Sequence, residues 1–502
     1  MAQSENPQAS PGAMGKSPEG GGGAARNGNL EPSSENLGGK VSEAVPNALI
    51  VGPASSETPA AQPPTALLSG AGQSGSLLVA NCSLSEVKPS ADPFFSGRKH
   101  FPELDGLRGV AISLVLVCHY CSVLPVGGWL VRAGQTGWVG VNLFFVLSGF
   151  LITGILCDSK GQGYFFRNFY ARRALRVFPL YFGVLGVELA ALLAIRAFHP
   201  GGWGHGDVPQ ALLTQQPWYW TYTSNIGFSL FHVDPLFQGH FWSLAVEEQF
   251  YLVWPLIVFV TPRRRLLLVC CLLAVAGTVS RPLMTALGFP FYPSIYFFTV
   301  PQFEALGAGA IAAVMARRAS GGGLAVGYRV AAVSGAAVAL LAYLAGGLAP
   351  AYSAGGDAVA HARLLNGLAS DVFCTGCDVG FLGLVGCVAS PGAGLLRGLF
   401  RIGALRTLGK YSYGLYVYHY LLLGIAQAAG NRVGVTEGGV PKTMVAAFWF
   451  VLANFLASLG LAFASYHLYE KRFLRLKKYF PERATNALTE AHQVNIQARK
   501  LE

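Results

Sequence analysis

Runs of apolar residues, each close to the length that crosses a lipid bilayer, follow one another along most of the chain, with short polar links between them. We place ten of them, at residues 107–123, 139–157, 177–197, 241–260, 266–280, 296–316, 328–346, 371–389, 411–428 and 444–468. In lipid, every backbone polar group needs an internal partner, so such runs form helices. The pattern predicts an all-α fold, a polytopic membrane helix bundle of about ten transmembrane helices.

The segments on either side of these runs have a different composition. Residues 1–97 are rich in Gly, Ser, Pro, Ala and Asn and have no sustained hydrophobic period. We expect a disordered low-complexity tail without a signal peptide, because such a segment buries too little apolar surface to offset its ordering entropy. Residues 98–473 are expected to form the transmembrane domain, and 474–502 a short C-terminal tail.

Charge gives the expected orientation. Only 12% of the residues are charged against 52% hydrophobic, and mean hydropathy is +0.43, as in membrane proteins. Lys and Arg gather in alternate links, whereas the link 198–240 has neither. By the positive-inside rule, both termini are expected in the cytoplasm, in a multi-pass protein of the inner (plasma) membrane. The net charge of +11 does not indicate nucleic-acid binding, because the basic residues punctuate apolar runs instead of forming one face.

The first run contains an arginine and a histidine, Arg108 and His119. Their separation of eleven residues returns to within roughly 20° of the same direction on a helix and spans about 16 Å along it. The two side chains should therefore share one face, with Arg108 near a membrane surface and His119 near mid-bilayer. An ionisable group at that depth usually marks chemistry or transport, although a neutral histidine hydrogen-bonded within the bundle is the simpler alternative.

The next two runs offer small residues and a basic cluster. In "FFVLSGFLITGIL", Ser148 and Gly149 are typical of close helix approach, which we favour over catalysis by Ser148. In "YARRALRVFPLYF", Arg172 or Arg173 would share a helix face with Arg176. Such a cluster serves equally as a topology signal, an anchor for lipid phosphate or a clamp for a phosphorylated ligand.

Two later runs carry further polar residues. "HFWSLAVEEQFYLVWPL" places Glu247 and Glu248 inside the membrane, about 100° apart on a helix, so we expect at most one to serve a shared site. "GKYSYGLYVYHYLLL" brings Ser412 and His419 to a similar depth. Its tyrosines are expected to form an interfacial belt.

Two Cys-x-x-C pairs, Cys118/Cys121 and Cys374/Cys377, do not predict a metal site. Thiols within a membrane span usually act as small hydrophobes, and no second ligand pair stands at a spacing that zinc requires. Oxidation of the second pair is conceivable if it reaches the outer side.

Together these segments resemble the acyltransferase 3 family of integral-membrane O-acyltransferases, which includes O-antigen acetylases. The resemblance extends from Phe101 to about Phe473 and rests on five segments in the family's order: "LDGLRGVAISLVLVCHY", "GVNLFFVLSGFLI", "RRALRVFPLY", "FWSLAVEEQFYLVWP" and "GKYSYGLYVYH". The family often continues "E-K-P" where Arg472 follows Lys471 here. Some members add a C-terminal hydrolase-like domain, which we do not expect in the residues after Lys471.

The resemblance implies transfer of an acyl group, usually acetyl, from acyl-coenzyme A to a hydroxyl of a cell-surface glycan or lipid-linked carbohydrate, with no permanently bound cofactor. His119 would act as general base or acyl relay, and Glu247 would orient His119 or bind the acceptor. Arg108 would hold coenzyme A phosphates together with Arg172, Arg173 and Arg176. Substrate-binding residues would be Ser148, Trp242 and His419. The expected partners are acyl-coenzyme A, the carbohydrate acceptor and membrane lipid, with no nucleic acid.

Transport is the alternative function. His119 and Glu247 would then relay protons while the arginines bind an anionic solute. Many transporters contain internal repeats, and no convincing self-similarity is visible here, which weighs modestly against transport. A scaffold role would leave the Arg108–His119 pair unexplained.

Overall fold

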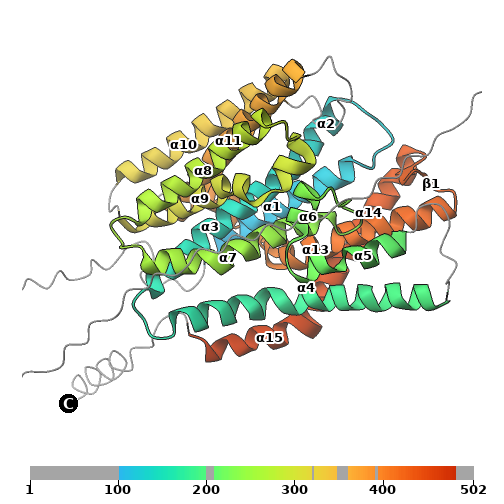
Figure 1. The fold of residues 1–502 in the computed structure, drawn as a ribbon, viewed down its shortest axis with the longest axis horizontal. Helices are drawn as coiled ribbons and strands as arrows, with labels where there is room; N and C mark the ends of the chain where they lie inside the picture. The colour runs from blue at the N-terminus through green and yellow to red at the C-terminus, as the bar shows by residue number, and fades with distance from the viewer. Residues whose placement is uncertain (1–100, 199–207, 319–321, 348–359, 391–393, 482–502) are drawn as a thin grey trace, which may run out of the picture. The chain divides into compact units, whose positions relative to one another are not determined.

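Ten long helices carry most of the described part of this computed structural model, which covers residues 101–198, 208–318, 322–347, 360–390 and 394–481. They are α1 (Pro102–Cys121), α3 (Val139–Ser159), α4 (Phe165–Phe198), α7 (Trp242–Val260), α8 (Leu266–Ala286), α9 (Thr299–Arg318), α10 (Gly322–Ala342), α11 (Ala360–Ala389), α13 (Gly403–Arg432) and α14 (Met444–Ser465). Each predicted run falls on one of them, so the prediction of an all-α polytopic bundle is confirmed (Figure 1).

Nine helices within the described ranges are long and apolar enough to cross a membrane. The helix outside this set is α13, whose 30 residues still span about 45 Å. Shorter helices connect the long ones: α2 (Trp129–Gln135), α5 (Val208–Trp220), α6 (Ser224–Leu230), α12 (Gly394–Phe400) and α15 (Lys471–Arg475). Single 3₁₀ or π turns are η1 (Thr136–Trp138), η2 (Gly239–Phe241), η3 (Phe291–Ile295), η4 (Tyr343–Gly347), η6 (Tyr466–Glu470) and η7 (Leu476–Tyr479). Two short strands, β1 (Thr436–Glu437) and β2 (Val440–Pro441), pair antiparallel.

Helix α4 begins well before the predicted run at residue 177, so Arg172, Arg173 and Arg176 lie on a helix and not in a link. The arginines before residue 177 limited the apolar run on its N-terminal side. Arginine, alanine and leucine are good helix formers, so the helix itself begins earlier, at Phe165. Residues 474–481, expected in the C-terminal tail, pack beside α4 through α15 and η7 (Figure 1). The expected tail 1–97 and residues 482–502 lie outside the described residues.

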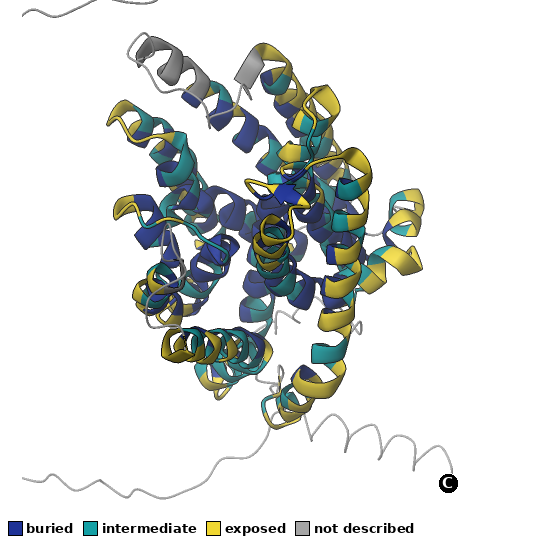
Figure 2. Ribbon diagram, turned by 90° about the vertical axis from the view of Figure 1, so that its right-hand side faces the viewer, coloured by how far each residue is buried: buried dark blue, intermediate teal, exposed yellow. Residues whose placement is uncertain are grey.

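The outward faces of the outer helices are apolar. On α8 the exposed side chains Leu268, Leu272, Val275 and Val279 recur every three or four residues, which is the spacing of one helix face. Figure 2 shows exposed residues on the periphery and buried ones in the centre. An apolar stripe of this kind faces lipid in a membrane bundle.

The central helices approach one another closely at glycines. Helix α3 packs along α9, and a Cβ atom on Gly149 would lie 2.0 Å from the carbonyl oxygen of Leu306. A Cβ atom on Gly309 of α9 would likewise lie 2.0 Å from the carbonyl oxygen of Val146. The expectation that the "SG" step allows close helix packing is confirmed for Gly149, and this contact fixes where α3 presents the neighbouring Ser148.

Candidate functional site

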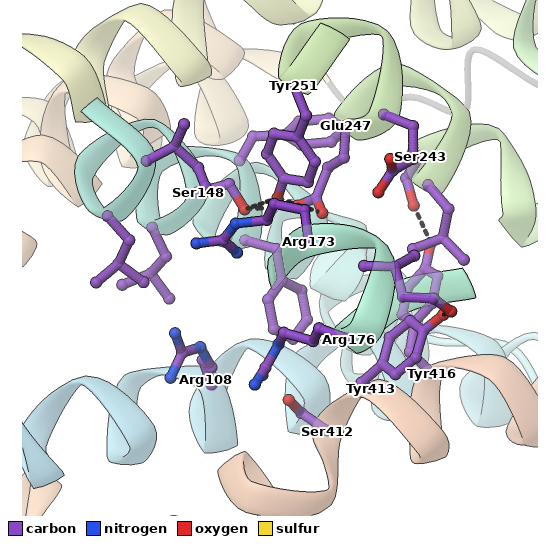
Figure 3. A pocket seen from close by; sticks show the side chains of 18 of the residues that line it. Arg108, Ser148, Arg173, Arg176, Ser243, Glu247, Tyr251, Ser412, Tyr413 and Tyr416 are labelled. Atoms are coloured by element: carbon purple, nitrogen blue, oxygen red, sulfur yellow. Dashed lines mark hydrogen bonds between the residues drawn. The ribbon is translucent and has the colours of Figure 1, made fainter. Parts of the chain in front are cut away.

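A cavity of about 110 Å³ lies between α1, α3, α4, α7 and α13 (Figure 3). Its walls combine apolar residues of α3 with the polar side chains of Arg108, Ser148, Arg173, Arg176, Ser243, Glu247, Glu248, Tyr251, Ser412, Tyr413 and Tyr416. The fold therefore brings together residues from all five segments that the sequence singled out.

Three arginines border this cavity. Arg173 and Arg176 come from one face of α4, and Arg108 comes from α1 (Figure 3). Arg108 pairs with Asp105 at 2.7 Å, whereas neither Arg173 nor Arg176 has a carboxylate within 4.0 Å among the described residues. Arg173 instead lies over the rings of Phe169 and Tyr251, at 5.9 and 5.6 Å. Guanidinium groups in this setting suit an external anion.

Arg172 has a different environment. Its Nη1 donates hydrogen bonds to the carbonyl oxygens of Lys477 and Phe480, at 3.3 and 3.0 Å, and it does not line the cavity. Of the two pairings left open by the sequence, Arg173 with Arg176 is the one that faces the cavity. Arg172 joins α4 to the C-terminal segment.

Glu247 lies at the α7 wall of the cavity. Its carboxylate oxygens accept hydrogen bonds from Ser148 Oγ at 2.7 Å and Tyr251 OH at 2.9 Å (Figure 3). Ser148 thus contributes its hydroxyl as well as its small size. Glu248 also borders the cavity, because directions about 100° apart both meet this wall. That at most one of the two glutamates serves a shared site stays a prediction.

A cluster of three histidines lies beside the cavity. His119 Nδ1 is 3.0 Å from Nε2 of His419, which is completely buried. The ring of His240 lies 5.3 Å from that of His419, and the ring of Tyr420 lies 4.7 Å from that of His119, tilted by 53°. None of these histidines lines the cavity. The partner of His119 is therefore His419, and the hydrogen bonds of Glu247 go to Ser148 and Tyr251.

Tyr416 separates the cavity from the histidine cluster. It lines the cavity, and its ring lies 5.8 Å from His419 and 5.4 Å from His240. Its hydroxyl donates to the His240 carbonyl oxygen at 2.8 Å and lies 2.5 Å from Ser243 Oγ. Ser412, Tyr416 and His419 follow one face of α13 from the cavity to the cluster.

The expected belt of interfacial tyrosines is wrong for this helix. Tyr411 and Tyr416 are buried, and the hydroxyl of Tyr413 donates to the carbonyl oxygen of Val177 at 2.7 Å. Packing of α13 between α1 and α14 turns these side chains inward.

One further residue that the sequence suggested does not line the cavity, whereas two that it did not suggest do. Trp242 is buried against Phe145, Tyr296 and Phe297 and does not line the cavity. Sequence reasoning missed Ser243 and Tyr251, although Ser243, Glu247 and Tyr251 follow one another at steps of four residues. That polar stripe on an apolar helix was a readable signal.

Within the described ranges, no group of three or more His, Cys, Asp or Glu residues is arranged to hold a metal ion. Cys118, Cys121, Cys374 and Cys377 are free thiols.

Residues 101–467 match the family model described as an acyltransferase domain. Relatives include YrhL of Bacillus subtilis, named as a peptidoglycan O-acetyltransferase, which is 29% identical over 74% of this chain and 55% of its own length. The O-acetyltransferase OatA of Staphylococcus aureus is 26% identical over 65% of this chain and 51% of its own. The peptidoglycan O-acetyltransferase OatA of Listeria monocytogenes is 33% identical over 38% and 30%. The chain thus spans about half, or less, of these relatives. No solved structure gives a significant match.

Proposed function

Because this chain belongs to the acyltransferase 3 family, we propose that it is a membrane O-acetyltransferase. It would move an acetyl group from acetyl-coenzyme A to a hydroxyl of a cell-surface glycan or membrane-linked carbohydrate. The observation that carries the proposal is the cavity with two arginines that have no described carboxylate within 4.0 Å, one of whose lining residues, Tyr416, packs against His419, the partner of His119. The relatives named as peptidoglycan O-acetyltransferases favour a glycan acceptor.

The arginines would bind the acyl donor. Arg108, Arg173 and Arg176 present planar donors that match phosphate oxygens. The cavity of about 110 Å³ is smaller than the roughly 300–1,000 Å³ of pockets that enclose a drug-sized ligand. It would therefore hold only part of coenzyme A, with a phosphate at the arginines and the rest of the nucleotide outside.

His119 would carry out the proton transfer. It would take the proton of the acceptor hydroxyl as the hydroxyl oxygen bonds to the thioester carbonyl carbon. The carbon–sulfur bond then breaks, and the proton passes from His119 to the departing thiolate of coenzyme A. Tyr416 and Ser243 would have to part for the acetyl group to reach His119, since their contact lies between the cavity and the cluster. Glu247 would hold the hydroxyls of Ser148 and Tyr251 in place.

The proposed orientation follows from charge. With both termini in the cytoplasm, Arg108 lies at the cytoplasmic end of α1, where acetyl-coenzyme A is available, and His119 lies about 16 Å deeper. The acceptor would approach from the outer side. A reporter fused after Glu502 should be active in the cytoplasm; activity only outside would overturn this orientation.

The test of the function is label transfer by the full chain in lipid nanodiscs. With acetyl-coenzyme A labelled in the acetyl group and solubilised peptidoglycan strands, we expect label on the glycan. His119→Gln keeps a hydrogen-bonding group but removes the base, and should lower the rate by roughly 10²–10⁴-fold. The matched control is His467→Gln, because His467 bonds to Tyr411 outside both cavity and cluster. Near-normal transfer by His119→Gln, or no transfer by the unaltered protein, would contradict the proposal.

A further inference from the structure

The hydrogen bonds of His419 determine which of its ring nitrogens carries the proton. Nδ1 lies 2.9 Å from the carbonyl oxygen of Leu415 and 2.8 Å from that of Tyr416. Carbonyl oxygens only accept hydrogen bonds, so Nδ1 must be the N–H donor. The side chain is completely buried, and no described carboxylate lies within ion-pair distance of it, so the ring is neutral and Nε2 has a lone pair.

The same accounting then extends to His119. Nε2 of His419 can only accept, and the atom 3.0 Å from it is Nδ1 of His119. His119 must therefore carry its proton on Nδ1 and keep the lone pair on Nε2. One chain of hydrogen bonds, from the α13 backbone through His419 to His119, therefore favours a single tautomer, beside the interaction of the His119 ring with the backbone of Val115.

We propose that His419 is a positioning residue for acyl transfer: it fixes the ring of His119 and its tautomer, so that Nε2 of His119 is the atom that takes the acceptor proton. This rests on the proposed function. It reassigns His419 from substrate binding, since the cavity does not include it.

The arrangement also stabilises the transient product of proton transfer. When Nε2 of His119 takes a proton, the bond from Nδ1–H to His419 becomes charge-assisted and therefore stronger. In serine hydrolases a carboxylate has this place behind the catalytic histidine, and an enzyme whose histidine is held in the wrong tautomer loses most of its activity. Here the partner is neutral, held by backbone carbonyls and by packing of His240 against its ring at 5.3 Å.

Two substitutions of His419 distinguish the effect of its hydrogen bond to His119 from the effect of its side-chain volume. In His419→Gln, the side-chain oxygen can accept from His119 Nδ1–H near the former place of Nε2, and the amide can donate to the carbonyl of Leu415 or Tyr416. His419→Leu keeps an apolar volume and removes the hydrogen-bond acceptor. We expect kcat to fall about 100-fold in the leucine variant, with KM for acetyl-coenzyme A unchanged, and to stay within about tenfold of the unaltered protein in the glutamine variant.

The control is His467→Leu, which removes a histidine bonded to Tyr411 and should leave kcat unchanged. Equal loss of kcat in the glutamine and leucine variants, or full activity of the leucine variant, would overturn the proposal.

Nitrogen NMR of the full chain labelled with ¹⁵N-histidine reads the tautomer without activity. His119, assigned by its loss in His119→Gln, should show a proton-bearing Nδ1 and an unprotonated Nε2, and His419→Leu should mix the two forms. A proton on Nε2 in the unaltered protein would refute the inference. This readout also separates the two claims: an active His119→Gln variant refutes the proposed function, whereas the spectrum alone decides the tautomer.

Discussion

This bundle contains two groups of arginines, one with Arg281 alone and one with Arg173 and Arg176, which differ in burial and in what surrounds them. Arg281 of α8 is buried and hydrogen-bonds to Glu304 of α9, while its Nη2 lies 3.6 Å from the carboxylate of Asp378 of α11. Arg173 and Arg176 border a cavity and have no carboxylate within 4.0 Å among the described residues. Burying an unpaired charge is costly, so Arg281 is neutralised within the protein. Arg173 is half-buried and Arg176 exposed, so both are open to an external anion.

The sizes of the cavities beside the two groups of arginines support this distinction. The cavity beside Arg281 measures about 10 Å³, which is room for one water at most. Asn142 also donates to Asp378 at 2.8 Å, and Arg281 Nη2 donates to the Pro301 carbonyl oxygen at 3.1 Å. The cavity at Arg173 and Arg176 is about 110 Å³. An arginine within the bundle therefore indicates a ligand only when the fold leaves it both unpaired and accessible.

Arg281→Leu should have the largest effect. It leaves Glu304 and Asp378 buried without their counter-charge, and losing one partner of a buried ion pair costs about 3–5 kcal/mol. We expect a strongly lowered midpoint of thermal unfolding in detergent and little monodisperse protein. Combining it with Glu304→Leu and Asp378→Leu should recover part of the stability. Unfolding indistinguishable from that of the unaltered protein would remove the contrast between the two arginine groups.

Arg173→Gln with Arg176→Gln should leave the thermal unfolding nearly unchanged and weaken donor binding. A hydrogen bond to a charged group contributes about 1.5–3 kcal/mol, so losing even one contact raises the Kd for acetyl-coenzyme A at least tenfold. Titration calorimetry in nanodiscs measures this. Loss of the fold comparable to Arg281→Leu would show that these arginines are structural.

Glu247→Gln should change donor affinity in the opposite direction. Glu247 interacts electrostatically with Arg173 and Arg108, so neutralising it makes the cavity more positive. We expect the Kd for acetyl-coenzyme A to fall by about threefold, which is the size of effect that a solvent-accessible pair of charges usually has. Transfer should stay within about tenfold if Glu247 only holds Ser148 and Tyr251; a loss as large as that of His119→Gln would assign it to proton transfer.

Arg172→Gln should have the smallest effect on the donor. Its hydrogen bonds go to the carbonyl oxygens of Lys477 and Phe480, so donor affinity should change less than twofold, about 0.4 kcal/mol. A tenfold weaker Kd would return Arg172 to the phosphate site that the sequence suggested.

Much of the fold could be predicted because a bilayer restricts the possible structures. Apolar length alone located the ten long helices, including α13 with its many polar residues. Helix ends were harder to predict: the apolar run begins only after the arginines of α4, whereas the helix begins at Phe165. Charge changes the hydropathy of a segment without ending a helix.

The site was predictable in its members more than in its contacts. Arg108, Arg173 and Glu247 were singled out from local pattern and Ser148, as a site residue, from the family resemblance; all line one cavity. The partner of His119 was not found, because it depends on how α1 packs along α13, and one sequence does not contain that register. For the same reason, Trp242 was expected at the site but is buried against Tyr296 and Phe297.

The central claim is that the cavity arginines bind the phosphates of the acyl donor, and a comparison of two thioesters tests it directly. Acetyl-coenzyme A carries phosphates and acetyl-pantetheine carries the same thioester without them. For the full chain in nanodiscs, we predict that acetyl-pantetheine binds at least tenfold more weakly, and that Arg173→Gln with Arg176→Gln removes most of this difference. Equal affinity for the two thioesters, or a difference that persists in the double variant, would contradict the account.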